Sequence, residues 1–153
     1  MKTNTQKNKG FTLIELIMVT IILGILAAVA IPRYVATVTQ AEAAAEDAVI
    51  SSIKSGLETY ATEQLMANGR RSWPTNPFTS LNTSPSGYTS GVAGIAGDNA
   101  DVDAEWTFNI TSNNITHMRG DNSLHSWDYV QGVTTSGLEA VGTLGGRIAG
   151  AGN

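Results

Sequence analysis

The sequence predicts an α+β fold, in which a long N-terminal helix, half membrane-spanning and half amphipathic, packs against a small antiparallel β-sheet. Three features of the 153-residue chain support this prediction. Residues 11–31 are almost wholly apolar, residues 34–61 repeat apolar or small side chains every three or four positions, and short stretches after residue 104 alternate apolar with polar side chains. The repeat of three or four positions is typical of one face of a helix, and the alternation of apolar with polar side chains is typical of a half-buried strand.

The apolar stretch, residues 11–31, reads FTLIELIMVTIILGILAAVAI. As a helix it would be roughly 31 Å long, which is enough to cross the hydrocarbon core of a bilayer. Residues 1–10 hold three lysines and no acid, whereas residues 11–153 hold six basic and 13 acidic side chains. Because basic flanks stay in the cytoplasm, we expect a single-pass protein with residues 1–10 inside and the acidic bulk outside.

A secretory signal peptide would share the basic start and the apolar run. The run here is longer than the usual signal core, and no clean small-x-small cleavage site precedes a polar mature start. In addition, the carboxylate of Glu15 lies five residues into the run, where a signal peptide would gain nothing from it. We therefore interpret residues 11–31 as a membrane anchor that remains part of the mature protein.

The second half of the helix, residues 33–67, is predicted to be amphipathic. Its end is expected at Asn68-Gly69, since glycine is the usual residue just past a helix. Pro32 lacks the amide hydrogen that a helix interior uses, so we expect a bend or a local loosening there. The predicted buried stripe consists of Tyr34, Val38, Ala41, Ala45, Ala48, Ile53, Leu57, Tyr60 and Ala61, and the charged residues mostly off the stripe are Glu42, Glu46, Asp47, Lys54, Glu58 and Glu63.

Residues 68–153 are predicted to form a loop-rich β domain. Residues 69–100 are rich in Gly, Ser, Thr, Asn and Pro, which indicates a long surface loop with at most a short turn of helix. Three strands are expected, over residues 105–111, 115–119 and 126–130, and Trp106, Phe108 and Ile110 share one face of the first. The glycine-rich tail, residues 142–153, is expected to be flexible.

Residues that carry catalysis are sparse in this chain. It has no cysteine, which excludes disulfides, thiolate metal sites and cysteine nucleophiles. His117 and His125 lack metal-ligand spacing, and we interpret His117 as a strand side chain and Trp73, Trp106 and Trp127 as core anchors. No G-x-S-x-G elbow is present, and the acidic pI near 5.0 argues against a nucleic-acid partner. We therefore expect no enzymatic activity.

An acidic segment is the one candidate metal site. Asp98, Asp101, Asp103 and Glu105 place four carboxylates within eight residues, and calcium takes about six to eight oxygen ligands of this kind. The segment lacks the sixth-position glycine and the twelfth-position glutamate of an EF-hand. A solvated acidic loop is the alternative interpretation, so no cofactor is required and calcium is a hypothesis.

The start of the apolar run carries a family resemblance. KGFTLIE at residues 9–15, followed by an apolar helix with Gly24 and Pro32, resembles the start of type IV pilins and of type II secretion pseudopilins. The resemblance covers residues 5–67 and implies a pilin-like fold. It also implies that a prepilin peptidase cleaves between Gly10 and Phe11, removes residues 1–10 as a leader and leaves a Phe11 amine that becomes N-methylated.

The resemblance gives Glu15 a role in assembly. After cleavage, Glu15 could neutralise the Phe11 amine of its own chain or the same amine of the next subunit. The resemblance favours the second pairing, because in the family the corresponding glutamate is taken to set the stagger of incoming subunits. The alternative is that Glu15 merely lies near the positive end of its own helix.

The function that the resemblance implies is that of a structural subunit, in a type IV pilus-like or a type II secretion pseudopilus filament that polymerises through the N-terminal helix. Many pilins close their C-terminal loop with a disulfide, which this chain cannot form, and this difference favours the pseudopilus. The serine- and threonine-rich loop, however, is unlike a calcium-clamped pseudopilin tail. The pilus-like filament and the secretion pseudopilus therefore both remain as alternatives.

The implied partners are copies of the chain itself, a prepilin peptidase, an inner-membrane assembly platform and other minor pilins or pseudopilins. The implied location is the bacterial inner membrane, with the leader cytoplasmic and the C-terminal domain periplasmic or extracellular, and then the filament. A different class of protein is the alternative: a membrane-anchored binding module that displays a small extracytoplasmic domain without polymerising. Sheared filaments of high mass would distinguish the subunit from the anchor.

Overall fold

The computed structural model describes residues 10–90, 99–136 and 141–150 of the chain. Leader residues 1–9 and the candidate calcium ligand Asp98 lie outside the described residues. The chain divides into two compact units, Met1–Ala43 and Ala44–Asn153. Along the chain the elements are α1 (Leu13–Asn68), the 3-10 helix η1 (Pro77–Ser80), β1 (Trp106–Asn109), β2 (Asn114–Met118), β3 (Leu124–Val130), β4 (Thr143–Leu144) and β5 (Ile148–Ala149).

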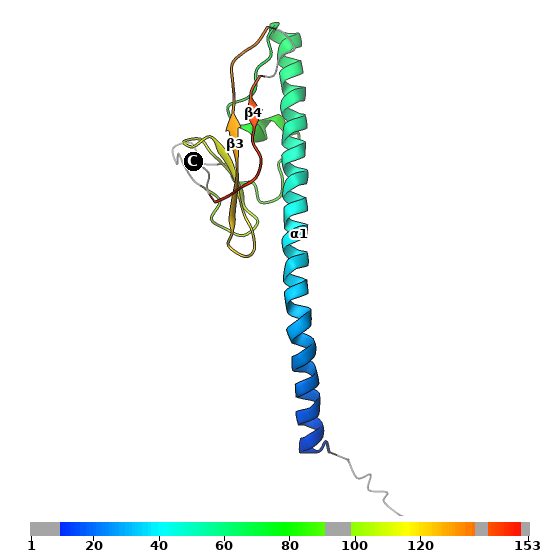
Figure 1. The fold of residues 1–153 in the computed structure, drawn as a ribbon. Helices are drawn as coiled ribbons and strands as arrows, with labels where there is room; N and C mark the ends of the chain where they lie inside the picture. The colour runs from blue at the N-terminus through cyan, green and yellow to red at the C-terminus, as the bar shows by residue number, and fades with distance from the viewer. Residues whose placement is uncertain (1–9, 91–98, 137–140, 151–153) are drawn as a thin grey trace, which may run out of the picture. The chain divides into compact units, whose positions relative to one another are not determined.

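The N-terminal element, α1, is a single helix of 56 residues (Figure 1). It ends where the sequence predicts, because Gly69 adopts the left-handed conformation with a φ of 69°. The Gly69 amide donates a hydrogen bond to the carbonyl of Leu65 at 2.9 Å, which closes the last turn. The chain is helical on both sides of Gly24 and Pro32, and the bend expected there stays a prediction.

The C-terminal half of α1 contributes a buried stripe to the core of the second unit. Ile53, Leu57 and Ala61 are fully buried, and Val49 and Ile50 pack partly against the same core. These positions recur every three or four residues and so share one helix face. The core therefore rests on α1 as well as on the sheet, as the sequence predicts.

Two parts of the predicted stripe are wrong. First, the expected apolar positions between Tyr34 and Ala48 are exposed, with Tyr34 at 71% and Val38 at 38%. Second, Glu46, which was expected on the charged face, is fully buried. Periodicity placed Glu46 outside the stripe because a carboxylate counts as polar, but basic side chains from elsewhere in the chain bind it in the interior.

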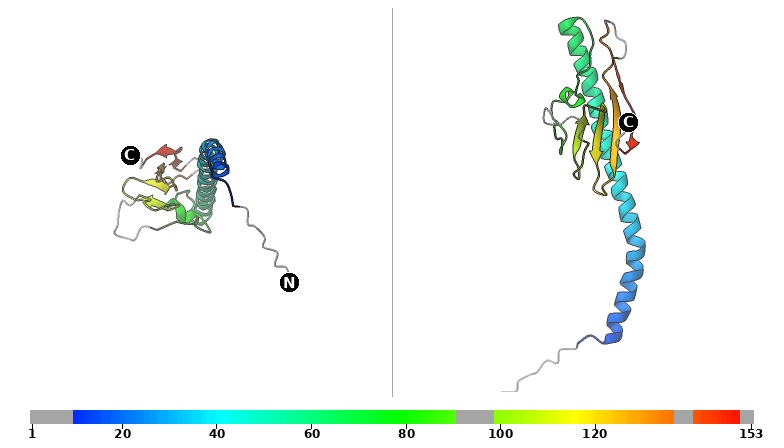
Figure 2. Two further views of the ribbon diagram at one scale, coloured as in Figure 1. Left: turned by 90° about the horizontal axis from the view of Figure 1, so that it is seen from below. Right: turned by 90° about the vertical axis from the view of Figure 1, so that its left-hand side faces the viewer.

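The sheet is antiparallel, with the strand order β1-β2-β3-β4, and β5 pairs with β3 as well. Trp106 of β1 lies opposite His117 of β2, and Thr116 of β2 lies opposite Ser126 of β3. Figure 2 shows these strands beside the C-terminal half of α1. The first three strands agree with the predicted ranges to within two residues at each end, so the expected arrangement of a long N-terminal helix and a small antiparallel sheet is confirmed.

The first strand ends earlier than expected because Asn109 begins a turn. Its side-chain oxygen accepts hydrogen bonds from the backbone amides of Thr111 and Ser112 at 2.9 and 3.1 Å. Ile110, predicted to share the core face of this strand, lies beyond the end of β1 and is 54% exposed. A side chain that binds its own backbone in this way commonly replaces ladder hydrogen bonds at strand ends.

The tail differs from the prediction as well. Instead of being flexible throughout, it forms β4 and β5 along the outer edge of β3 over described residues 141–150. Glycine allows this close approach, because a side chain at Gly142 would collide with the Val130 carbonyl and would lie 2.8 Å from the Trp73 ring. Glycine content was therefore a sign of tight packing here rather than of mobility.

The long loop, expected at the surface, supplies part of the core. Trp73 and Phe78 are both buried, and the Asn76 side chain fixes η1 by accepting a hydrogen bond from the Phe78 amide at 3.0 Å. Phe78 stacks on Tyr88 with ring centroids 4.1 Å apart and meets the edge of Trp106 at 6.5 Å. Trp106 and Trp127 are buried too, which confirms that the tryptophans are core anchors.

Truncating the helix stripe tests this core. We expect Leu57→Ala to lower the free energy of unfolding of the C-terminal unit by about 3 kcal/mol, since a fully buried leucine leaves a cavity that neighbours fill only in part. Urea unfolding of the full chain in detergent micelles, followed by tryptophan fluorescence, measures this, because all three tryptophans lie in this unit. The control Thr62→Ala, at an exposed position of the same helix, should change stability by less than about 0.5 kcal/mol. Equal stability of the two variants would contradict the packing.

Candidate functional site

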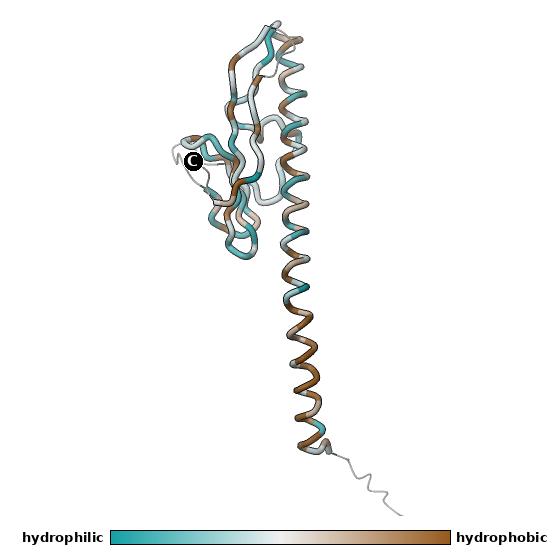
Figure 3. Tube along the Cα trace, viewed as in Figure 1, coloured by the Kyte–Doolittle hydropathy of each residue, from teal (hydrophilic) through white to brown (hydrophobic). Residues whose placement is uncertain are grey.

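The N-terminal part of α1 exposes a long apolar surface. Phe11 is 90% exposed, and Leu13 and Ile25 are each more than half exposed. Figure 3 shows hydrophobic residues running along this segment with few interruptions. Among the described residues α1 is the helix that is long and apolar enough to cross a membrane, with a mean hydropathy of 2.8 in its most apolar window. A signal sequence would meet the same criterion, so the residues at its start carry the distinction.

The start of α1 is closed by a reciprocal pair of side chains. The Glu15 carboxylate accepts hydrogen bonds from the Thr12 backbone amide at 2.8 Å and from the Thr12 hydroxyl at 2.7 Å. The Glu15 amide in turn lies 3.3 Å from the Thr12 hydroxyl oxygen, which accepts from it. This is a capping box, whose signature is Thr or Ser followed three residues later by Glu or Gln. Thr12 was not among the predicted site residues, although its spacing to Glu15 matches the capping-box signature.

The predicted cleavage pair precedes the cap. Gly10 and Phe11 lie before the first helical residue, and both are exposed. The backbone of this pair is therefore exposed and outside the helix. The rest of the leader, residues 1–9, lies outside the described residues.

A second polar site lies inside the C-terminal unit, around the buried carboxylate of Glu46. The guanidinium of Arg119 donates two hydrogen bonds to the Glu46 carboxylate, from Nε to Oε1 and from Nη2 to Oε2, both 2.6 Å long. His117 Nδ1 lies 3.0 Å from Oε1, and Arg147 Nε lies 2.8 Å from Oε2. Both carboxylate oxygens are therefore bound by side chains from β2, from the residue directly after it and from the segment between β4 and β5. No local pattern could have revealed this site, because its members are about 70 to 100 residues apart.

The charges around Glu46 decide its ionisation. Burial by itself raises the pKa of the carboxyl group, but the hydrogen bonds from Arg119 and His117 and the charges of Arg119 and Arg147 act in the opposite direction. The net effect is a pKa below the ordinary value of 4.5. Glu46 is therefore ionised at neutral pH, and two guanidinium groups compensate its burial.

The cluster continues to the surface through Arg147. The Nη2 atom of Arg147 donates to the Asp47 carboxylate at 2.5 Å, and the guanidinium carbon lies 5.8 Å from the centre of the Trp127 ring. One side chain near the chain end thus joins two consecutive acids of α1 and an aromatic residue of β3. This arrangement fastens the C-terminal segment to the helix and the sheet.

The candidate calcium ligands do not form a metal site among the described residues. Glu105 uses its Oε2 to accept hydrogen bonds from the backbone amides of Asp101 and Val102, at 3.0 and 3.3 Å. No group of three or more His, Cys, Asp or Glu side chains in residues 10–90, 99–136 and 141–150 is arranged to hold a metal. Because Asp98 lies outside these ranges, calcium binding by Asp98, Asp101, Asp103 and Glu105 stays a prediction.

Comparison with known proteins identifies the N-terminal site. Residues 5–31 match the family model described as the prokaryotic N-terminal methylation motif. The N-terminal region of this chain is therefore similar to that of type IV pilins. The type IV narrow pilus major component PilA5 of Thermus thermophilus is 46% identical over 61 residues, which make up 40% of this chain and 50% of the relative. This chain thus spans about half the length of that relative, and no solved structure matches it.

The methylation motif gives the N-terminal residues a common context. The matched range includes Gly10, Phe11, Glu15 and Gly24, and Pro32 follows directly after it. The resemblance that residues 9–15 carry is therefore confirmed. The type IV pilin family is structural rather than enzymatic, which agrees with the sparse catalytic residues of the sequence.

Neutralising the buried carboxylate tests the second site. We expect Glu46→Gln to lower the free energy of unfolding at pH 7 by about 3 kcal/mol, because Arg119 is left as a buried charge without its counter-ion. The stability that ionised Glu46 contributes is complete above pH 4.5, its ordinary pKa, and is lost as the pH falls through the lower folded-state pKa. The free energies of unfolding of the wild type and of Glu46→Gln should therefore become similar at low pH. Urea unfolding of full chains in micelles from pH 7 to pH 3 measures both effects; a difference independent of pH would show that charge is not the cause.

Proposed function

We propose that this chain is the structural subunit of a type IV pilus-like filament, stored in the inner membrane and polymerised through the N-terminal part of α1. The observation that supports this most is the joint occurrence of a prokaryotic N-terminal methylation motif at residues 5–31 and an exposed apolar helix surface that begins within it. An apolar surface of this length needs either lipid or other helices around it. Storage in a bilayer followed by packing in a filament core provides the two environments in turn.

Processing would prepare the subunit for assembly. A prepilin peptidase would hydrolyse the peptide bond between Gly10 and Phe11, and the basic leader, which holds the three lysines of residues 1–10, would leave. The new Phe11 amine would then lie one residue before the capping pair of Thr12 and Glu15. N-methylation keeps the positive charge of the amine while adding apolar surface, which suits a group that enters a filament core.

The capping box suggests how the Glu15 carboxylate is hydrogen-bonded before assembly. A carboxylate within an apolar membrane helix costs roughly 3 kcal/mol on insertion scales unless it has a partner. In the uncleaved chain the amide and hydroxyl of Thr12 satisfy the carboxylate locally. In the filament, the Glu15 carboxylate would exchange this weak cap for the charged Phe11 amine of a neighbouring subunit, and so set the stagger between the two chains.

The identity of the relative favours a pilus over a secretion pseudopilus. The similar protein of Thermus thermophilus is named as the major component of a type IV narrow pilus, and its similarity to this chain extends beyond the short methylation motif, to 61 residues. We extend the pilus role to this chain on that basis. The assembly platform of the inner membrane and further minor pilins would be its partners, the C-terminal unit would face the periplasm and then the filament surface, and no catalytic activity is required.

One prediction of the proposed function concerns processing. Mass spectrometry of the filament or membrane form should find Phe11 as the first residue, carrying one added methyl group, because the leader boundary and the methylation motif meet at this position. Gly10→Leu should block cleavage and leave residues 1–10 attached, since the leader of the resembling family ends in glycine at this position. A mature chain that starts near Arg33 would instead identify a secretory signal and contradict the proposed function.

The second prediction separates the charge of Glu15 from its capping role. Glutamine serves in a capping box as well as glutamate, so Glu15→Gln keeps the helix cap and removes only the charge. We expect this variant to be cleaved and inserted normally but to yield several-fold fewer sheared filaments at matched membrane levels. Co-expression with the wild type should partly restore its incorporation.

Two results would contradict this mechanism. A filament yield equal to the wild type would exclude charge pairing at Glu15, and loss of leader cleavage would assign the residue to processing. Thr12→Val is the matched control, since it removes the hydroxyl of the cap and keeps the charge. It should assemble better than Glu15→Gln if the charge is what the filament needs.

A further inference from the structure

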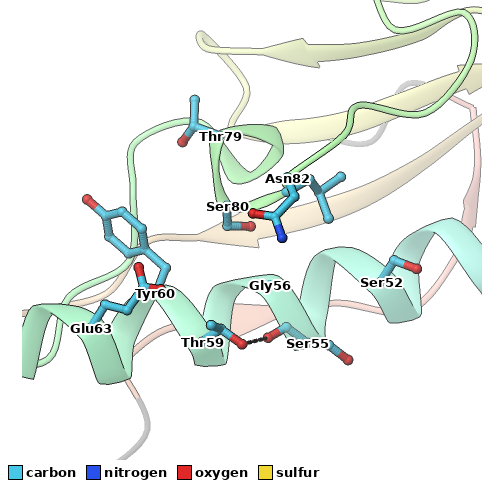
Figure 4. A pocket seen from close by; sticks show the side chains of 10 residues that line it. Ser52, Ser55, Gly56, Thr59, Tyr60, Glu63, Thr79, Ser80 and Asn82 are labelled. Carbon is cyan, nitrogen blue, oxygen red and sulfur yellow. Dashed lines mark hydrogen bonds between the residues drawn. The ribbon is translucent and has the colours of Figure 1, made fainter.

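A polar groove lies in the C-terminal unit, between α1 and the loop that contains η1 (Figure 4). Its volume is about 320 Å³. The groove follows from Gly56, because a side chain there would come within 2.7 Å of the Ser80 carbonyl oxygen and push the loop away from the helix. Its lining includes Ser52, Ser55, Thr59 and Glu63 of α1 and Thr79 and Ser80 of the loop.

The serine and threonine hydroxyls of the groove use their hydrogens in hydrogen bonds within the chain. Ser52, Ser55 and Thr59 each donate their hydroxyl hydrogen to the backbone carbonyl four residues earlier, at 3.0 Å. Thr79 and Ser80 each donate to the carbonyl three residues earlier, at 2.7 Å. Because the hydrogens are committed to the backbone, these five hydroxyls offer a ligand mainly hydrogen-bond acceptors.

The groove also carries a negative charge. Glu63 lines it, is exposed, and forms no ion pair with any residue in the part of the chain that the structure describes. Tyr60 and Asn82 of the lining can also donate, but the acceptor oxygens and the carboxylate outnumber them, and such a surface fits a group that is positively charged and rich in N–H donors. Ammonium and guanidinium groups have these properties, and neither accepts hydrogen bonds.

The mature chain would itself present such groups. Of its six basic side chains, Arg71, Arg119 and Arg147 are bound in ion pairs within the chain. The other three, Arg33, Lys54 and Arg70, are exposed and make no ion pair with a described residue. Copies packed side by side, as in the proposed filament, would bring these cations to neighbouring copies at high effective concentration.

We infer that the groove around Glu63 is a contact between subunits, and that it receives an unpaired basic side chain of a second copy. This inference rests on the proposed function and adds to it a site on the C-terminal unit, distinct from the contact at Glu15. Like charges placed together across an interface are strongly unfavourable. Since the same contact would recur at every subunit, reversing the charge of the groove should weaken the whole filament.

Charge reversal and its compensation test the inference in the full-length chain. We expect Glu63→Lys to lower the yield of sheared filaments several-fold at matched membrane levels, and a second reversal at one of the three cations, Arg33→Glu, Lys54→Glu or Arg70→Glu, to restore it. The reversal that restores assembly identifies the occupant. Asp128→Lys, which makes the same change of charge at an exposed position of β3, is the matched control and should assemble like the wild type. Tryptophan fluorescence should show that each variant keeps its fold.

Several outcomes would overturn the inference. Wild-type yield from Glu63→Lys would exclude the groove as a contact, and a loss that none of the three reversals restores would exclude a basic side chain of a second copy as its occupant. An equal loss from Asp128→Lys would show a general effect of charge. None of these results would affect the proposed function, which fails if the wild-type chain itself forms no filaments or if its mature form starts near Arg33.

Discussion

The fold of the C-terminal unit depends on one buried carboxylate. Glu46 is fully buried, and moving an ionised carboxylate out of water is costly unless opposite charges and hydrogen bonds replace the lost solvation. Arg119, directly after β2, supplies two hydrogen bonds of 2.6 Å, His117 lies 3.0 Å from the carboxylate, and Arg147 forms an ion pair with it. Since an unpaired Glu46 would be strongly unfavourable, this ion pairing disfavours any other register between helix and sheet that would separate Glu46 from its cations. Apolar contacts stabilise this pairing of helix and sheet, but the carboxylate makes it specific.

The same cluster explains how a chain without cysteines can hold its C-terminal segment. Arg147 lies between β4 and β5 and binds both Glu46 and Asp47 of α1. The two short strands that flank it cover the outer edge of β3, which would otherwise leave backbone groups open to pairing with other chains. Gly142 permits the close approach, because any side chain there would collide with the carbonyl of Val130. Ion pairs and a glycine thus hold the described segment 141–150 against α1 and β3.

The sequence predicts those features that depend on neighbouring residues. Periodicity located α1 and three strands, and Gly69 marked the end of the helix because the left-handed conformation there is local. The same reasoning failed for Glu46, since the partners that make its burial favourable are Arg119 and Arg147, which no local pattern connects to it. It failed for the tail because glycine permits both mobility and tight packing, and only the tertiary contacts decide between them. Among the N-terminal residues, the motif at 9–15 was recognised, but the capping partner Thr12 was overlooked.

Two carboxylates on one helix therefore illustrate two ways of placing an acid in apolar surroundings. The partner of Glu15 is three residues away, and the cap it forms can be broken without disturbing the rest of the fold. The partners of Glu46 come from a strand and from the chain end, so breaking them would separate the helix from the sheet. Both kinds of contact suit the filament subunit that we propose. The local contact would be given up to a neighbour on assembly, and the long-range contact would keep the C-terminal unit folded during that exchange.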